Sequence, residues 1–275
     1  MSRNRVAVVV ALVVGMGMWV ESAEAQWQRT DEGWCEEDWG DRDTDRSCLV
    51  LESSFDDPGA LSIDGGLNGG VTVEGWERDV VEVRAKVWAQ ARDMGRAEQL
   101  VDAVEIDMVR GRLSAEGPRT DRRESWGVSW EVFVPFDTDL DIEAHNGGIS
   151  LTDVSGRIRF EALNGGVRLT ELAGDVQGST TNGGLRIELA GAEWDGQGLD
   201  VQTTNGGVEI SVPEGYSARL ETGTVNGGIS LDFPVMVEGR VGRRLTTTLG
   251  EGGATVRATT TNGGVKILRG GRAIR

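Results

Sequence analysis

An Asn-Gly-Gly triplet recurs through the second half of the sequence and limits its fold more than any other feature. The triplet begins at Asn146, Asn164, Asn182, Asn205, Asn226 and Asn262, at separations of 18, 18, 23, 21 and 36 residues, the last being twice the shortest. Repeats of about 20 residues are typical of stacked arrays, in which each unit buries its apolar face against its neighbours. The sequence therefore predicts a repeat architecture.

The residues on both sides of each triplet alternate between apolar and polar. In the first unit, Leu140 and Ile142 precede Asn146 by six and four residues, and Ile149 and Leu151 follow it by three and five. The other units repeat this pattern, and the residue two positions before each Asn is always Ala or Thr. A period of two is typical of strands with one buried face, so each unit is predicted to contain two strands.

Two arrangements of these strands fit the pattern. Asn-Gly favours a type I′ hairpin turn, which would give an antiparallel β meander or barrel. The nearly constant unit length and the small residues beside the triplet favour instead the corners of a β-solenoid, where successive Asn side chains could hydrogen-bond to one another. We predict an all-β repeat β-solenoid of about 18–23 residues per unit, with these turn residues: Asn146, Gly147, Asn164, Gly165, Asn182, Gly183, Asn205, Gly206, Asn226, Gly227, Asn262 and Gly263.

The N-terminus is typical of an exported protein. Arg3 and Arg5 precede an apolar run from Val6 to Val20, and the small residues of Ala23-Glu24-Ala25 follow it. This order predicts a signal peptide over residues 1–25. No later segment is apolar enough to span a bilayer. The predicted location is the periplasm, the cell surface or the extracellular space.

The chain is strongly acidic, with a formal net charge of −17 that removal of residues 1–25 leaves unchanged. Eleven acidic residues lie between Asp31 and Asp57. A negative field of this size repels nucleic acid and anionic lipid. Nucleic acid is therefore excluded as a predicted partner.

Residues 26–58 form an acidic leader that contains both cysteines, Cys35 and Cys48. In an exported protein we expect a disulfide between them, worth about 3 kcal/mol if unstrained. A zinc site is disfavoured because further ligands are lacking. Asp41, Asp43 and Asp45 resemble a calcium loop weakly, since Arg46 stands where the sharp turn needs glycine. The acidic row from Asp137 to Glu143 is interpreted as a solvated strand face.

Residues 59–134 have a different character and are predicted to cap the solenoid, which then covers residues 135–275. Another triplet at Asn68 indicates a first unit. Asp93 is expected to cap a short helix whose apolar face includes Leu100 and Val101, and a hairpin is expected about Gly111. A solenoid needs its open end covered, and this helix-bearing segment can do so.

The run Val132-Phe133-Val134-Pro135, the repeated units, and Gly250-Glu251-Gly252-Gly253 before the last triplet resemble the putative adhesin family of bacterial β-strand-repeat domains. The resemblance extends over about residues 61–268. It implies a β-helical fold and an exported or envelope location. The family's name implies adhesion. Because the family is one of unknown function, the resemblance assigns no catalytic or ligand-binding role to any residue of this sequence.

The search for catalytic motifs favours a protein that is not an enzyme and needs no cofactor. The sole histidine, His145, lies at a turn, and no hydrolase, metalloprotease or phosphate-loop motif is present. Carboxylate pairs on a β-helix face leave open a carbohydrate-active enzyme. Trp194 and Tyr216 lie in the longer connections between units and are candidate recognition residues, although a Trp that covers a loop base is the commoner case.

We therefore expect an exported surface or envelope protein whose solenoid binds a macromolecular partner, either a glycan or a protein. The alternatives are a carbohydrate-active enzyme, as above, and an envelope-stress or assembly module that acts through a partner protein.

Overall fold

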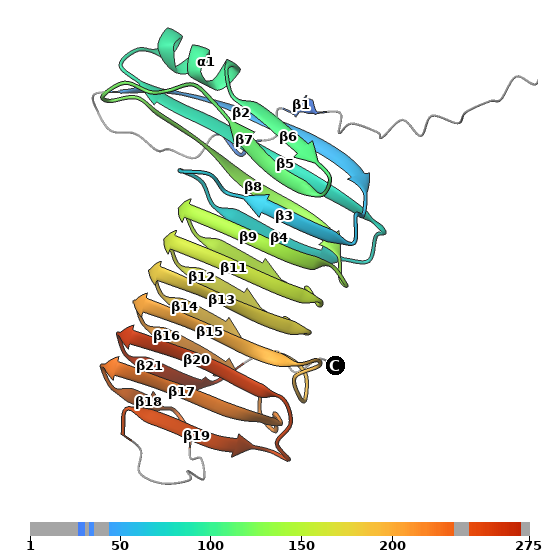
Figure 1. Cartoon of the computed structure of the whole chain (residues 1–275), viewed down its shortest axis with the longest axis vertical. Helices are drawn as coiled ribbons and strands as arrows, with labels where there is room; N and C mark the ends of the chain where they lie inside the picture. The colour runs from blue at the N-terminus through green and yellow to red at the C-terminus, as the bar shows by residue number, and fades with distance from the viewer. Residues whose placement is uncertain (1–26, 31–32, 36–43, 234–241, 271–275) are drawn as a thin grey trace, which may run out of the picture.

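The computed structural model describes residues 27–30, 33–35, 44–233 and 242–270. Within these residues, two β-sheets run along the molecule, and the helix α1 (Met94–Asp102) lies at one end (Figure 1). The 11-stranded sheet contains, in order of pairing, β1 (Gln28–Thr30), β2 (Asp45–Asp56), β5 (Val80–Ala91), β8 (Ser125–Pro135), β4 (Val71–Trp76), β10 (Ile149–Thr152), β12 (Val167–Thr170), β14 (Leu185–Glu188), β16 (Val208–Val212), β21 (Val265–Arg269) and β18 (Ile229–Leu231). The 10-stranded sheet contains β19 (Arg244–Leu249), β17 (Ala218–Asn226), β20 (Thr255–Asn262), β15 (Gly198–Asn205), β13 (Asp175–Asn182), β11 (Arg157–Asn164), β9 (Asp139–Asn146), β3 (Ala60–Asp64), β7 (Arg112–Glu116) and β6 (Glu105–Val109).

Each Asn-Gly-Gly triplet forms a corner between the two sheets. The strand before the triplet belongs to the 10-stranded sheet, and the strand after it belongs to the 11-stranded sheet. Successive units pair in parallel and in register, as Ile158 does with Leu140 in one sheet and Val167 with Ile149 in the other. The predicted β-solenoid is therefore confirmed, and the alternative of a meander or barrel is wrong.

The core lies between the two sheets and is continuous along the solenoid. The apolar residues flanking the triplets point inward and are buried, among them Ile142, Phe160 and Ile187, except that Ile229 and Leu231 in the outermost coil are only partly buried. Phe160 has room because its neighbour in the next coil is Gly178, where a Cβ would contact the phenyl ring. Along each strand, the apolar residues thus face the core and the polar residues between them face solvent, as the geometry of a strand requires.

The corner explains why the residue two positions before Asn is small and why the first glycine is needed. Thr203 donates a hydrogen bond from Oγ1 to the carbonyl of Gly183 in the neighbouring coil, at 2.7 Å, and Thr180 does the same to Gly165 at 2.8 Å. A Cβ on Gly183 would overlap the carbonyl of Gly165. The coils therefore approach each other through their backbones at every corner.

The asparagine side chains form one hydrogen-bonded ladder along the solenoid. Each Nδ2 donates to the Oδ1 of the neighbouring Asn at 2.7–3.3 Å, in the order Asn226, Asn262, Asn205, Asn182, Asn164, Asn146 and Asn68. Asn68 donates in turn to the carbonyl of Trp126 in the cap, at 3.1 Å. The expected ladder is present, and its far end is anchored to the cap backbone.

The order of the coils in space differs from their order in the sequence. The last coil, β20 and β21, lies between the coil of β15 and β16 and the coil of β17 and β18. We call β20 and β21 the inserted coil. The chain reaches it by first adding β19 antiparallel to the outer side of β17. Figure 1 shows the inserted coil in red between coils coloured orange.

The other end of the solenoid is covered by the cap, as the sequence predicts. Strands β2, β5 and β8 are antiparallel and extend the 11-stranded sheet, and α1 packs against β2 and β5. Asp93 is the N-cap of α1 and accepts a hydrogen bond from the backbone N–H of Arg96. Leu100 and Val101 are buried, and β6 and β7 form the expected hairpin. The triplet at Asn68 forms the first coil from β3 and β4.

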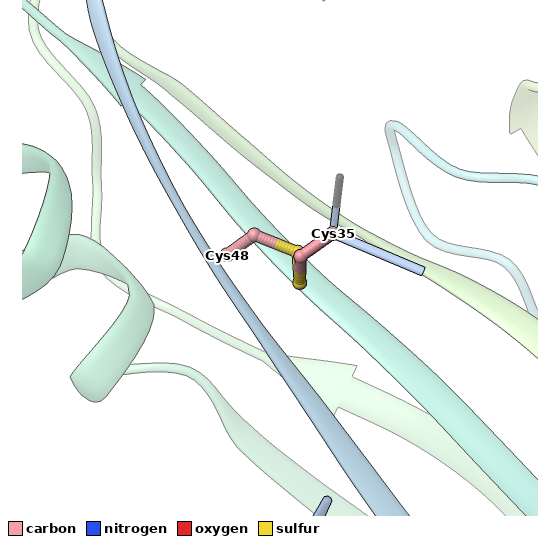
Figure 2. The surroundings of a disulfide bond; sticks show 2 residues. All are labelled: Cys35 and Cys48. Carbon is pink, nitrogen blue, oxygen red and sulfur yellow. A yellow bond between two sulfur atoms is a disulfide. The ribbon is translucent and has the colours of Figure 1, made fainter. Parts of the chain in front are cut away.

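The leader is attached to the cap by strand pairing as well as by the disulfide. Cys35 and Cys48 are bonded, and Cys48 lies in β2, which pairs with β5 along its whole length (Figure 2). Trp34 lies beside the disulfide, with Arg84 and Lys86 at 5.5 and 5.6 Å from its ring centroid. The disulfide thus holds Trp34 on the outer face of the cap sheet.

We expect replacement of both cysteines, C35S/C48S, to lower the free energy of unfolding by about 3 kcal/mol, because the closed loop no longer restricts the unfolded chain. Trp34 should then lose its contacts with Arg84 and Lys86 and become exposed to water. Urea unfolding followed by tryptophan fluorescence measures both effects. Dithiothreitol should destabilise the wild type and leave the double variant unchanged. Equal unfolding midpoints for the two proteins without reductant would contradict the prediction.

Two predictions lie wholly or partly outside the described residues. The predicted signal peptide covers residues 1–25, and Asp41 and Asp43 of the weak calcium-loop resemblance fall in the range 36–43. In the described part of the chain, no helix has the length and apolar character needed to cross a membrane.

Candidate functional site

The outer face of the 10-stranded sheet carries a groove of about 1050 Å³ that crosses six coils and reaches β19. We call it the polar groove. Its central row consists of the residue five positions before each triplet Asn, and strand register places these residues side by side: Asp141, Arg159, Gln177, Asp200, Arg257 and Glu221. Residues at the same position in successive repeats therefore lie next to one another on the surface and form a continuous row.

A second row, three positions before each Asn, is mostly uncharged. Its members, again aligned by register, are Glu143, Glu161, Ser179, Gln202, Thr259 and Gly223. The row ends beside Arg244 on β19. The aromatic residue nearest to the groove, Phe160, is only 1% exposed, so it contributes no ring surface. The polar groove thus offers hydroxyl, amide and charged groups to a partner.

Ion pairs organise the charged end of the central row. Arg257 lies between two carboxylates, with Nη1 3.3 Å from Asp200 and Nε 3.3 Å from Glu221. Arg219 donates a second hydrogen bond to Glu221 at 2.9 Å. This hydrogen bond, together with the positive charges of Arg257 and Arg219, holds the pKa of Glu221 below its ordinary value.

These carboxylates are suited to binding and poorly suited to general acid catalysis. Glycoside hydrolysis uses a carboxylic acid whose pKa is raised, so that it carries a proton at neutral pH. The pKa of Glu221 is shifted in the opposite direction, and Asp200 is paired with Arg257. Around Arg257, the charged groups of the groove are therefore arranged to donate and accept hydrogen bonds.

The structure places both candidate recognition aromatics in the core, which corrects the expectation that they face a partner. Trp194 is 6% exposed and donates from Nε1 to the carbonyl of Gly174 at 3.0 Å. Tyr216 is 3% exposed, and burial, with the nearby negative charge of Glu193, raises its pKa. The longer connections between coils fold their aromatic rings inward because these rings cover apolar strand ends.

Of the acidic residues singled out in the sequence, Asp45 and those from Asp139 to Glu143 lie on two different strands, β2 and β9. Asp45 is the first residue of β2, while Asp139 accepts a hydrogen bond from the backbone N–H of Arg157 and pairs with its side chain. Asp141 and Glu143 line the polar groove, and His145 is exposed at the end of β9. Among the described residues, no three His, Cys, Asp or Glu side chains gather in a way that could hold a metal ion.

Sequence reasoning missed the central row of the polar groove. The signal was available, because all six residues share one position relative to their triplets. Predicting the row from these positions requires two facts: that the coils stack in register, and the order in which they stack. Without the inserted coil between its neighbours, Arg257 would not lie between Asp200 and Glu221.

Comparison with known proteins supports the repeat architecture. Residues 136–268 match the Toastrack DUF4097 family model, which confirms over this range the resemblance to a β-strand-repeat family of unknown function. A search of curated proteins finds no match.

Three solved structures resemble the chain at low sequence identity. The first is a putative cell adhesion protein from Clostridium sporogenes, with 12% identity, a TM-score of 0.42, and coverage of 82% of this chain and 100% of that one. The second is a putative adhesin from Bacteroides fragilis, with 8% identity, a TM-score of 0.33, and coverage of 80% and 96%. The third is a putative adhesin from Parabacteroides merdae, with 13% identity, a TM-score of 0.32, and coverage of 83% and 97%.

Proposed function

We propose that this chain is an exported, non-catalytic surface or envelope protein that binds a macromolecular partner through the polar groove. Adhesion is the role that the family resemblance implies. The observation that carries the proposal is the central row of the groove, in which six coils present aligned charged and amide side chains over a continuous surface. A row of this length suits an extended partner better than a small molecule, which needs an enclosed site.

The chemistry of the groove supports binding over hydrolysis. Its hydroxyl and amide groups can donate and accept hydrogen bonds, as the hydroxyl groups of a glycan or the polar surface of a protein would require. The pKa of Glu221 is lowered, whereas a general acid for this reaction needs a raised pKa. The carbohydrate-active enzyme is therefore the weaker alternative, and the envelope-stress or assembly module differs from adhesion only in its partner.

The test is to incubate the chain from residue 26 with a panel of cell-wall and extracellular polysaccharides and envelope proteins, with and without calcium. Retention of the protein on a panel member is the expected result, and new reducing or unsaturated ends are expected to be absent. Release of such ends would overturn the proposal in favour of an enzyme. Failure of every member to retain the protein would also count against it.

A matched pair of variants connects binding to the groove. We expect R257A to weaken retention about tenfold, equivalent to about 1.4 kcal/mol, because Arg257 organises two carboxylates of the central row, Asp200 and Glu221. R157A is the control, since Arg157 is on the same sheet, pairs with Asp139 and lies outside the groove lining. Exposed ion pairs contribute up to about 1 kcal/mol to stability, so both variants should fold. Equal retention of both variants would place binding elsewhere.

A further inference from the structure

The outer face of the 11-stranded sheet carries a row of side chains whose charge is opposite to that of the whole chain. The row consists of the residue four positions after each triplet Asn. On four consecutive strands, β12, β14, β16 and β21, register aligns Arg168, Arg186, Glu209 and Lys266. Three of these four residues are basic, although the chain has a net charge of −17. The row therefore carries more positive than negative charge, against the sign of the whole chain.

The basic side chains border a second groove, of about 760 Å³, which we call the basic trough. Its floor is formed by the second glycine of each triplet, including Gly166, Gly184 and Gly207, all of which are exposed. A Cβ on these three glycines would lie 3.4–3.6 Å from the nearest atom, which is ordinary contact. At these three corners, backbone packing thus requires the first glycine of the triplet and leaves space at the second. The floor of the basic trough therefore consists of exposed backbone.

The charges in the trough are incompletely paired. Arg186 pairs with Glu209 at 3.1 Å, whereas Arg168 and Lys266 have no ion-pair partner among the described residues. Arg168 and Arg186 occupy directly paired positions on neighbouring strands, which are about 4.8 Å apart. Like charges in facing positions are destabilising, and an anion between them would relieve the repulsion. A carboxylate can accept parallel hydrogen bonds from a guanidinium group, so it suits these arginines.

We propose that the basic trough binds an anionic polysaccharide that carries carboxylate groups on its sugars, with the chain lying along the row and crossing the strands. A sugar unit of an extended glycan is close in length to the spacing between strands, so two successive carboxylates can meet Arg168 and Arg186 on neighbouring strands. Glu209 interrupts the row, and Lys266 lies on the strand beyond it. The glycine floor lets the sugar rings approach the sheet backbone.

The geometry favours this class of partner over the other anionic macromolecules. An extended peptide can gain affinity by adding a strand at a sheet edge, and the trough lies on a face whose backbone groups are already paired. A duplex nucleic acid or an anionic membrane presents a broad charged surface, which the net charge of −17 would repel beyond the screening length of about 8 Å. A single polymer chain contacts the basic row alone.

The experiment uses the chain from residue 26 and measures its affinity for polygalacturonate by calorimetry at about 0.15 M salt. We expect the triple variant R168Q/R186Q/K266Q to bind at least about tenfold more weakly than the wild type, since it removes every positive charge from the row. Methyl-esterified polygalacturonate, which lacks the charges, should bind neither protein. Circular dichroism verifies that the variants are folded.

Two further variants separate the trough from general electrostatics. R119Q/R122Q/R123Q removes the same number of positive charges from exposed residues outside both grooves and should retain wild-type affinity for polygalacturonate. G184L keeps every charge but places a side chain on the floor of the trough, and it should weaken binding. The proposal is overturned if the two triple variants lose affinity equally, if the wild type does not bind, or if duplex DNA or anionic vesicles bind more tightly than polygalacturonate.

Discussion

Replacing Gly183 with alanine is expected to lower the free energy of unfolding by about 4 kcal/mol. The new Cβ would overlap the carbonyl of Gly165, so two backbones that now touch must separate. Forced overpacking costs up to about 3 kcal/mol. Separation also strains the hydrogen bond from Thr203 Oγ1 to the carbonyl of Gly183, worth about 1 kcal/mol. Urea denaturation followed by circular dichroism measures the change.

Gly184 provides the matched control, since it is the next residue in the same corner. A Cβ there would lie 3.4 Å from the carbonyl oxygen of Gly207 and would point to solvent. We expect G184A to change stability by less than about 1 kcal/mol, with the reduced entropy of the unfolded chain partly offsetting the new contact. If the two alanine variants were equally stable, the coils would not be held in backbone contact at the first glycine.

Ending the chain after Gly253 is expected to cost more than the loss of an outermost coil. The truncation removes the inserted coil and with it the buried side chains of Val256, Val265 and Ile267, worth roughly 6 kcal/mol together. That loss is comparable with the whole stability of a typical domain. It also leaves β15 and β17 without their shared neighbour. We expect residues 218–249 to become sensitive to limited proteolysis while the cap and the first coils remain protected.

A pair of point variants in the full chain tests the same coil order without truncation. Leu231 and Ile267 are register partners in β18 and β21, but Ile267 is fully buried and Leu231 is partly exposed at the end of the stack. I267A should cost about 3 kcal/mol and L231A about 1 kcal/mol. If coils stacked in sequence order, Ile267 would be the outer residue and the ranking would be reversed.

The local structure of each coil was predictable from the sequence because its causes are local. Alternation around Asn146 identifies two strands, and a small residue such as Ala144 or Thr203 marks the narrow corner. The chemistry of the asparagine amide, which both donates and accepts, is enough to predict the ladder. Similar reasoning identified the helix after Asp93, since an N-cap and an apolar face are properties of a short segment.

The stacking order was not predictable, because the coils are nearly equivalent at their interfaces. Val256 and Ala258 of the inserted coil match the inward positions that Leu199 and Val201 occupy in the coil beside it. Nothing in these side chains distinguishes one neighbour from another. The groove rows were hidden for the same reason. Trp194 was a candidate recognition residue because of its loop position, and it takes the commoner role of a buried ring.

The inserted coil also determines when the molecule can be completed. During synthesis, β17 and β18 emerge before β20 and β21, although they lie farther from the cap. Folding that proceeds from the cap can add coils in order only as far as β15 and β16, because the next neighbour of that coil has not yet been made. The last step must then close a gap between segments already formed, a long-range contact of the kind that slows folding. Until residues 255–269 are synthesised, β15 and β16 lack their next neighbours and form an unpaired sheet edge. Unpaired edges can pair with the wrong strand, so we expect misassembly to be most frequent during this interval.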